Sequence, residues 1–136
     1  MSAAPPSRRL GWALTLVATF TMSISYVDRQ ALAILAPTIT KDLGIDDGTL
    51  GLLLSSFSLA YLVGAPFGGR FIDTLGARRG LLAAVLAWSL VAALHAIVPT
   101  TGLLFTLRIA LGLAESPSFP GSAQTVHRAL APADRP

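Results

Sequence analysis

Long apolar runs separated by short polar segments dominate the chain. A transmembrane helix needs about 20 mostly apolar residues. Runs of suitable length predict four spans, over residues 10–36, 50–67, 80–98 and 102–126. The polar connections between them are residues 37–49, 68–79 and 99–101. The pattern therefore predicts an all-α membrane protein with four transmembrane helices.

The N-terminal residues 1–9 are rich in Ser, Ala and Pro and end in Arg8 and Arg9, which predicts a short cytoplasmic tail. Two arginines before an apolar run are also typical of a secretory or twin-arginine leader peptide. Here the run is longer than the apolar part of a leader, lacks a convincing cleavage site, and is followed by three further spans. We therefore interpret it as the first transmembrane helix.

The composition supports a membrane protein and excludes several other classes. Hydrophobic residues make up 53% of the 136 residues and charged residues only 12%, against roughly 25% charged in a soluble domain. The ten basic residues give a net charge of +3, but they are scattered without aromatic interleaving, so we expect no nucleic-acid partner. With no cysteine, catalytic triad, phosphate loop or metal-ligand cluster, the sequence predicts neither an enzyme nor a metal site.

Basic residues flank the spans on one side, which predicts the orientation in the membrane. They are Arg8, Arg9, Arg70, Arg78, Arg79, Arg128 and Arg135. The other side carries Lys41 among three aspartates. Because cytoplasmic loops are enriched in Lys and Arg, we expect a multi-pass protein of the inner membrane with its N-terminus in the cytoplasm.

The second span carries a stripe of small residues. Ser56, Ala60, Gly64 and Gly68 recur every four residues. Small residues at this spacing let two helix backbones approach closely in a membrane. The stripe predicts a neighbouring helix, although small residues are also simply common in membrane helices.

Charged residues inside two spans are the main candidates for function, because such residues usually mark pathways or proton relays. Asp28 and Arg29 lie in the first span, and Arg108 and Glu115 in the fourth, so each helix carries an acid and a base. Arg108, Gly112 and Glu115 share one helix face over about 10 Å. The alternative is that Asp28 and Arg29 lie near the outer surface and reach water there.

Two prolines follow Glu115 in the fourth span. Pro117 and Pro120 each remove a backbone hydrogen bond, and a membrane helix tolerates this where a neighbour or a water-filled cavity satisfies the freed carbonyl groups. We expect a bend beside Glu115 that forms part of a cavity wall.

The connection between spans two and three contains a spaced set of Gly, Asp and Arg residues. They are Gly69, Asp73, Gly76, Arg78 and Arg79, in the pattern GxxxDxxGxRR. Glycine permits a tight turn with unusual backbone angles. At this position between spans, the pattern resembles the loop signature of the major facilitator superfamily, the twelve-helix secondary transporters.

The resemblance extends over most of the chain. The segments "YVDRQALAILAP", "LSSFSLAYLVGAPFGGRFIDTLGARRG", "AWSL" and "RIALGLAESPSFPG" are similar to the anion:cation symporter family, which imports sugar acids such as hexuronates, galactonate and glucarate. The resemblance implies helices 1–4 of a twelve-helix transporter. Residues 127–136 resemble the start of a cytoplasmic linker, so we expect a truncated chain whose C-terminal helices are missing. Thr74 and Ala77 depart from the usually basic loop positions, which weakens the expected inward gate.

The resemblance also implies roles for individual residues. Asp28 and Glu115 match positions linked to proton coupling, and Arg29 and Arg108 match positions linked to anion binding. We group Tyr26 with the two arginines as substrate-binding. A proton gradient would supply the energy without any cofactor. An arriving organic anion would compete for an arginine, and the released carboxylate would take up a proton, which couples the two fluxes.

We expect the residues of the loop signature to form the gate.

Three other interpretations of the whole chain remain open. The chain could be a small four-helix transporter that works as a homodimer, or an inactive truncated product. A membrane-embedded enzyme would need a polar cluster at the cytoplasmic helix ends, where only Asp73 is available.

Overall fold

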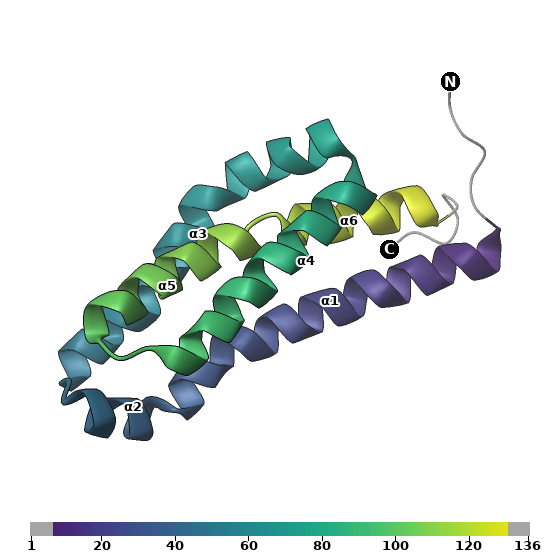
Figure 1. Cartoon of the computed structure of the whole chain (residues 1–136). Coiled ribbons are helices and arrows are strands. Elements are labelled where there is room, and N and C mark those ends of the chain that lie inside the picture. Colours follow the sequence, from purple (N-terminus) through teal and green to yellow (C-terminus); the bar gives the residue numbers. More distant parts are fainter. Residues whose placement is uncertain (1–6, 131–136) are drawn as a thin grey trace.

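A computed structural model describes residues 7–130, and the regular structure in this part of the chain is entirely helical (Figure 1). The elements in chain order are α1 (Arg8–Ile34), α2 (Ala36–Leu43), α3 (Asp47–Leu75), α4 (Ala77–Leu94), the short 3₁₀ helix η1 (His95–Ile97), α5 (Thr101–Glu115) and α6 (Ser118–Ala129). The predicted all-α class is confirmed.

Three of the predicted membrane spans are continuous helices. Helices α1, α3 and the α4–η1 unit are each long and apolar enough to cross a membrane. The fourth predicted span, residues 102–126, is divided into α5 and α6 at Ser116 and Pro117. A proline inside a helix removes one backbone hydrogen bond and clashes with the carbonyl four residues earlier. In place of the predicted bend, the helix is interrupted over these two residues.

The helices extend well beyond the predicted spans. Residues 68–79, expected as a loop, are almost wholly helical, because α3 continues to Leu75 and α4 begins at Ala77. The turn rests on Gly76, whose φ of 80° lies in the left-handed region that favours glycine. Residues 37–49, also expected as a connection, include most of α2 and the start of α3.

The two predicted terminal segments fall mostly outside the described residues. Of the expected tail 1–9, residues 1–6 lie outside, while Arg8 and Arg9 already begin α1. Of the expected linker 127–136, residues 131–136 lie outside, and residues 127–129 complete α6.

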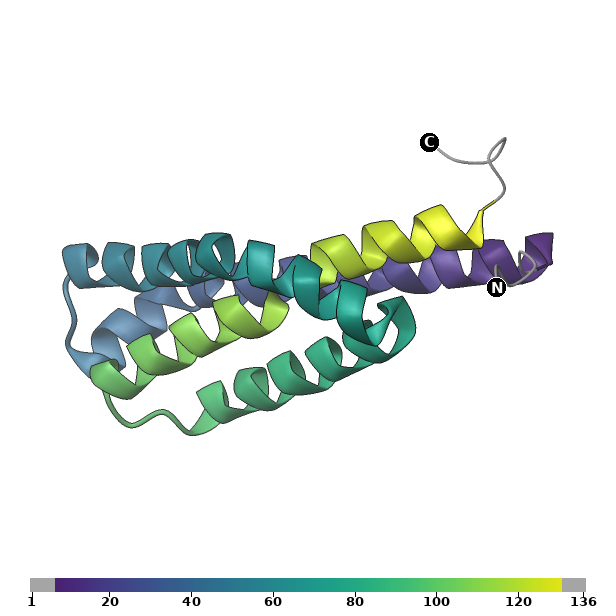
Figure 2. The same ribbon diagram turned by 90° about the horizontal axis from the view of Figure 1, so that it is seen from above.

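Helix α1 runs along the length of the bundle and contacts it through a narrow stripe. Figure 2 shows α6 lying along the first part of α1, and the two helices are in contact. The buried residues of α1 are Gly11, Ala18, Ser25 and Leu32. They are seven positions apart, which places them on one face of a helix. Most of the remaining surface of α1 is apolar and exposed, as suits lipid or further helices.

The small-residue stripe on α3 packs against α5 and the break, as predicted. A Cβ atom on Gly64 would lie 2.7 Å from Ser116 Oγ, and one on Gly68 would lie 2.8 Å from the backbone nitrogen of Pro117. From the other side, a Cβ on Gly112 would lie 2.5 Å from the carbonyl oxygen of Phe57. The absence of side chains at these positions lets α3 and α5 pack closely.

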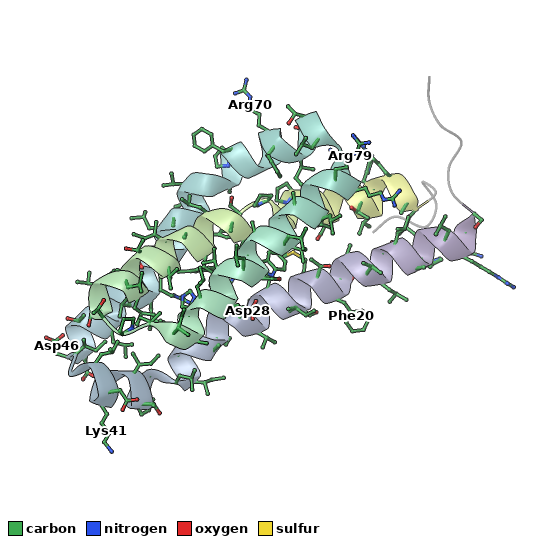
Figure 3. The ribbon with its side chains drawn as sticks, in the orientation of Figure 1. Phe20, Asp28, Lys41, Asp46, Arg70 and Arg79 are labelled. Atoms are coloured by element: carbon green, nitrogen blue, oxygen red, sulfur yellow. The ribbon has the colours of Figure 1, made fainter. Side chains whose placement is uncertain are left out.

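The charged residues outside the bundle core separate toward its two ends. Figure 3 shows Arg70 and Arg79 at the end where α3 meets α4, and Lys41 and Asp46 at the opposite end. Asp46 caps α3, since its side chain accepts a hydrogen bond of 2.7 Å from the Thr49 amide. The charge asymmetry expected from the sequence is therefore present between the two ends.

Candidate functional site

An ion pair links α1 to the end of α5. Arg29 Nε lies 3.1 Å from Glu115 Oε2, and Ser25 Oγ donates a hydrogen bond of 2.7 Å to the same oxygen. Ser25 and Glu115 are fully buried. We call Ser25, Arg29 and Glu115 the paired cluster.

This pairing shows how charged residues of the two helices compensate each other. The sequence places an acid and a base in each helix, Asp28 with Arg29 and Arg108 with Glu115. Within residues 7–130, Arg29 pairs with Glu115 across the helix boundary, and neither same-helix pair is formed. Adjacent residues on a helix point about 100° apart, so Asp28 and Arg29 diverge.

Two aromatic residues of α3, Phe57 and Tyr61, lie against the guanidinium groups of the arginines. The guanidinium carbon of Arg29 lies 4.2 Å from the ring centroid of Tyr61 and 5.3 Å from that of Phe57. The guanidinium of Arg108 lies 4.8 Å from the same Phe57 ring. Cations over aromatic faces at these distances are attracted by the ring quadrupole.

The sequence analysis missed Phe57 and Tyr61. They are four residues apart and their rings stack, with centroids 6.2 Å apart. Phe57 lies seven positions before Gly64 of the small-residue stripe and Tyr61 lies three positions before it, so all three share one face of α3. That spacing was the available signal, since the stripe already identified the face of α3 that packs against α5.

Arg108 is more buried than Arg29, and among residues 7–130 it forms no ion pair. It is 3% exposed, whereas the Arg29 side chain is 24% exposed. Within the described part of the chain, Arg108 forms no ion pair and its Nε has no hydrogen-bond partner. Buried charges in proteins are normally paired and hydrogen-bonded, so this guanidinium is suited to an anion from outside the protein.

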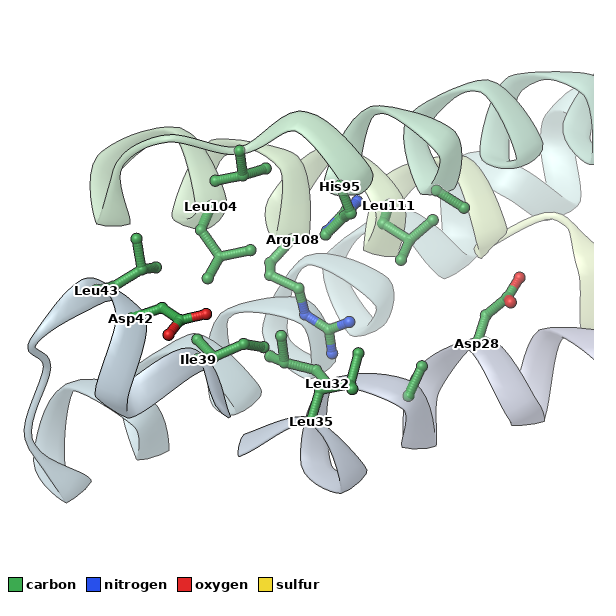
Figure 4. Close-up of a pocket in the computed structure, with 13 residues that line it drawn as sticks. Asp28, Leu32, Leu35, Ile39, Asp42, Leu43, His95, Leu104, Arg108 and Leu111 are labelled. Atoms are coloured by element: carbon green, nitrogen blue, oxygen red, sulfur yellow. The ribbon is translucent and has the colours of Figure 1, made fainter. Parts of the chain in front are cut away.

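Arg108 lines a cavity of about 310 Å³ between α1, α2, α4–η1 and α5 (Figure 4). The other polar residues in its wall are Asp28, Asp42 and His95, and the rest of the wall is mainly aliphatic, including Leu104 and Leu111. Figure 4 shows the Arg108 side chain reaching from α5 toward α1. We call this space the open cavity.

Asp28 and Arg108 therefore line one cavity, whereas Arg29 and Glu115, which pair with each other, do not line it. Asp28 lies on the cavity wall. It precedes Ile34, the last residue of α1, by six positions, which is about 9 Å along the helix at 1.5 Å per residue. Tyr26 does not join either group, because its side chain is 63% exposed and it does not line the cavity.

The residues of the loop signature lie around the α3–α4 turn, away from the open cavity. Gly69 and Asp73 lie in the last turns of α3, and Arg78 and Arg79 in the first turn of α4. Gln124 of α6 donates a hydrogen bond of 2.9 Å to Asp73 Oδ1. The segment is thereby connected to the helix that follows the break.

A second cavity lies at the same end of the bundle. It measures about 810 Å³ and lies between α1, the α3–α4 turn and α6. Arg78, Arg79 and Arg128 line it together with mostly aliphatic residues. No group of His, Cys, Asp and Glu residues able to hold a metal ion occurs among residues 7–130.

Comparison with known proteins identifies the family. Residues 18–136 match the Major Facilitator Superfamily. The chain is 36% identical over 128 residues to a probable galactarate/D-glucarate transporter of Pseudomonas putida, covering 90% of this chain and 28% of that protein. It is 34% identical over 127 residues to a D-galactonate transporter of Escherichia coli, covering 93% and 29% of the two chains.

A hexuronate transporter of Bacillus subtilis is 38% identical over 94 residues, which cover 69% of this chain and 22% of that one. The chain thus spans less than a third of the length of these relatives. No solved structure matches it. From the extent of the family match and the apolar helices, the chain belongs to the Major Facilitator Superfamily, a family of multi-pass membrane transporters.

Proposed function

We propose that this chain forms helices 1–4 of a proton-coupled symporter that imports a small organic anion, a sugar acid, across the inner membrane. The observation that carries the proposal is Arg108, a buried cation that forms no ion pair in the described part of the chain and lines a cavity of about 310 Å³. The names of the relatives support the substrate class, because galactarate, D-glucarate, D-galactonate and hexuronates are all sugar acids.

The guanidinium of Arg108 would bind a carboxylate of the substrate. Arginine presents planar donors that match a carboxylate with two parallel hydrogen bonds, and such charge-assisted bonds are about twice as strong as neutral ones. The cavity volume lies at the lower end of the range for small-molecule sites, about 300–1,000 Å³. It therefore suits a small acid rather than a large one.

The acids would carry the proton. An anion bound to Arg108 adds negative charge beside Asp28, which lines the same cavity, and this favours the protonated form of Asp28. Glu115 would respond through Arg29, its ion-pair partner. If Arg29 moved toward a substrate carboxylate, Glu115 would lose its counter-charge in a buried site and bind a proton. The energy source would be the proton gradient alone, with no cofactor.

The gate would lie at the end of the bundle where α3 meets α4. The hydrogen bond between Gln124 and Asp73 joins α6 to this turn, and Gly76 supplies a flexible backbone position there. Arg78 and Arg79 carry positive charge at the same end, as does Arg8 of α1. That charge supports an orientation with this end and the N-terminus in the cytoplasm.

Further helices of the same protein would complete the transporter. Each relative is more than three times as long as the segment that matches this chain, and transporters of this kind hold the substrate between repeated units. The exposed Tyr26 would contact substrate only in such a larger cavity. The codons after that for Pro136 test this directly: we expect an open frame encoding more apolar spans, and an immediate stop codon would contradict it.

The transport proposal is tested with the whole gene product, expressed from its start codon to its natural stop codon and reconstituted in lipid vesicles. We expect uptake of labelled D-glucarate to be driven by an acidic exterior and abolished by a protonophore. Uptake that needs a sodium gradient instead would refute proton coupling. Failure to take up D-glucarate, D-galactonate and a hexuronate alike would refute the substrate class.

A further inference from the structure

The ring of His95 has a defined hydrogen-bonding state. His95 opens η1 directly after α4, and its Nδ1 lies 2.8 Å from the carbonyl oxygen of Val91. A carbonyl oxygen can only accept, so Nδ1 carries the hydrogen atom. In the neutral ring the other nitrogen, Nε2, is then a hydrogen-bond acceptor.

This acceptor is buried without a partner. Among residues 7–130, no group donates a hydrogen bond to His95 Nε2. The large majority of buried polar side-chain atoms have at least one partner, and the protein supplies none here. His95 also lines the open cavity, whose wall includes Arg108 and Asp28. Figure 4 shows His95 and Arg108 on neighbouring parts of that wall.

The two residues offer complementary chemistry to one small molecule. Arg108 presents only donors and a positive charge, which suits a carboxylate. His95 Nε2 presents a neutral acceptor, which suits a hydroxyl group. Asp28 would be a less constant acceptor, because a carboxyl group that binds the transported proton gains an O–H donor and loses part of its acceptor capacity during the cycle. His95 can accept in both states.

We propose that His95 Nε2 accepts a hydrogen bond from a hydroxyl group of the substrate whose carboxylate binds Arg108, and so selects hydroxylated acid anions over plain carboxylates. The inference rests on the proposed transport function and specifies the substrate class of the same cavity. A site built to bond a hydroxyl group rejects the analogue that lacks it, because the site's own polar atom is then left unpaired.

The test compares two six-carbon dicarboxylates in vesicles that contain the whole gene product. D-glucarate carries hydroxyl groups on its chain, and adipate has the same chain length without them. Labelled D-glucarate gives KM, and unlabelled adipate gives an inhibition constant. For the wild type we expect adipate to bind at least tenfold more weakly than D-glucarate.

Three variants separate the hydrogen bond from a structural role. His95→Phe keeps a ring of similar size without an acceptor, and we expect KM for D-glucarate to rise about tenfold while inhibition by adipate stays within twofold. His95→Gln can donate to the Val91 carbonyl and still offer an acceptor, so it should recover most of the loss. His127→Phe, on the exposed side of α6, serves as the control and should match the wild type.

The outcomes distinguish this inference from the transport proposal. If the wild type takes up D-glucarate but does not prefer it to adipate, the role of His95 is refuted while transport stands; this comparison needs no variant to fold. Equal losses for both acids in His95→Phe would likewise refute it. If the wild type takes up no hydroxylated acid, the transport proposal fails and this inference fails with it.

Discussion

Arg29 and Arg108 lie against the same phenylalanine ring, that of Phe57, but they differ in their ion pairing and in their burial. Arg29 forms an ion pair with Glu115 and lies over Tyr61 as well as Phe57. Arg108 has only the Phe57 ring, and no ion pair within the described residues. The arginine without a counter-charge is the more buried one, with 3% exposed against 24%.

This order is the reverse of what stability alone would favour. Burying a charge costs several kcal/mol, and only a close counter-charge with good hydrogen bonds compensates for it. A chain selected only for stability would pair its deepest cation first. The difference separates Arg29, which links α1 to α5 through an ion pair, from Arg108, which lines the open cavity and forms no ion pair among residues 7–130.

The largest effect is expected from a change that disturbs both arginines at once. Gly112→Leu places a side chain where a Cβ would lie 2.5 Å from the Phe57 carbonyl oxygen and 3.0 Å from Ala60 Cβ. Helix α5 must then move away from α3, and overpacking of this kind costs typically 1–3 kcal/mol, sometimes more. We expect a lower melting temperature in detergent and loss of uptake.

The matched control for that change is Gly51→Leu. Gly51 is also helical, in α3, and no atom lies within 4 Å of the position that its Cβ would occupy. Its melting temperature and uptake should stay near those of the wild type. Equal destabilisation by the two substitutions would mean that the close packing of α3 against α5 is not what positions the two arginines.

A second prediction separates the two arginines by the sign of their effect on stability. Arg108→Gln removes an uncompensated buried charge, so we expect thermal stability to be unchanged or higher while uptake falls at least 100-fold. Arg29→Gln leaves Glu115 buried without its counter-charge, so we expect destabilisation, by less than the about 3–5 kcal/mol of a fully buried pair because the Arg29 side chain is 24% exposed. Melting temperature and uptake are measured on both variants. Destabilisation by Arg108→Gln would show that this arginine has a protein partner after all.

The sequence shows where the charged residues lie along the chain but not how they pair. Apolar periodicity and residue type were enough to locate Arg108 and Glu115 in the fourth span, because a charge inside an apolar run is visible in the sequence. Their partners depend on how α1 is placed relative to α5, which follows from tertiary contacts such as those of α1 with α6 beyond the break at Pro117. No local pattern in one helix specifies such a placement.

Helix ends were predicted less well for a related reason. Hydropathy detects the part of a helix that suits lipid, and it ended the second span at Phe67, while α3 continues to Leu75. The last turns are amphipathic and pack against α4 and α6, with Ile72 buried and Asp73 exposed. The contact that stabilises them is tertiary, so a window of apolar residues does not detect it.

A third, smaller effect concerns the coupling of proton and substrate through the paired cluster. Glu115→Gln keeps the size of the side chain and its bond to Ser25 but removes the charge opposite Arg29. We expect uptake driven by a pH gradient to fall about tenfold or more, whereas exchange of labelled for unlabelled substrate, which needs no net proton movement, continues. Normal pH-driven uptake in this variant would remove Glu115 from the coupling mechanism and leave Asp28 as the candidate.

The smallest effect is expected at Asp46, which belongs to neither arginine group. The bond that its carboxylate accepts from the Thr49 amide holds the pKa of Asp46 below its ordinary value. A lowered pKa in the folded state stabilises the fold above the pKa of the unfolded chain, and this contribution is lost as pH falls through the folded value, below about pH 4.

Between pH 5 and 8 the contribution of Asp46 is therefore constant. Asp46→Ala should speed hydrogen exchange at the first turn of α3 without changing the pH dependence of uptake, and Asp47→Ala, which leaves this cap intact, should change neither. Because Asp46 is fully exposed and its bond is local, it has no route to the buried arginines. A shifted pH profile of uptake in Asp46→Ala would mean that a group outside the paired cluster and the open cavity titrates during transport. The residues of that cluster and that cavity would then not be sufficient to explain proton coupling.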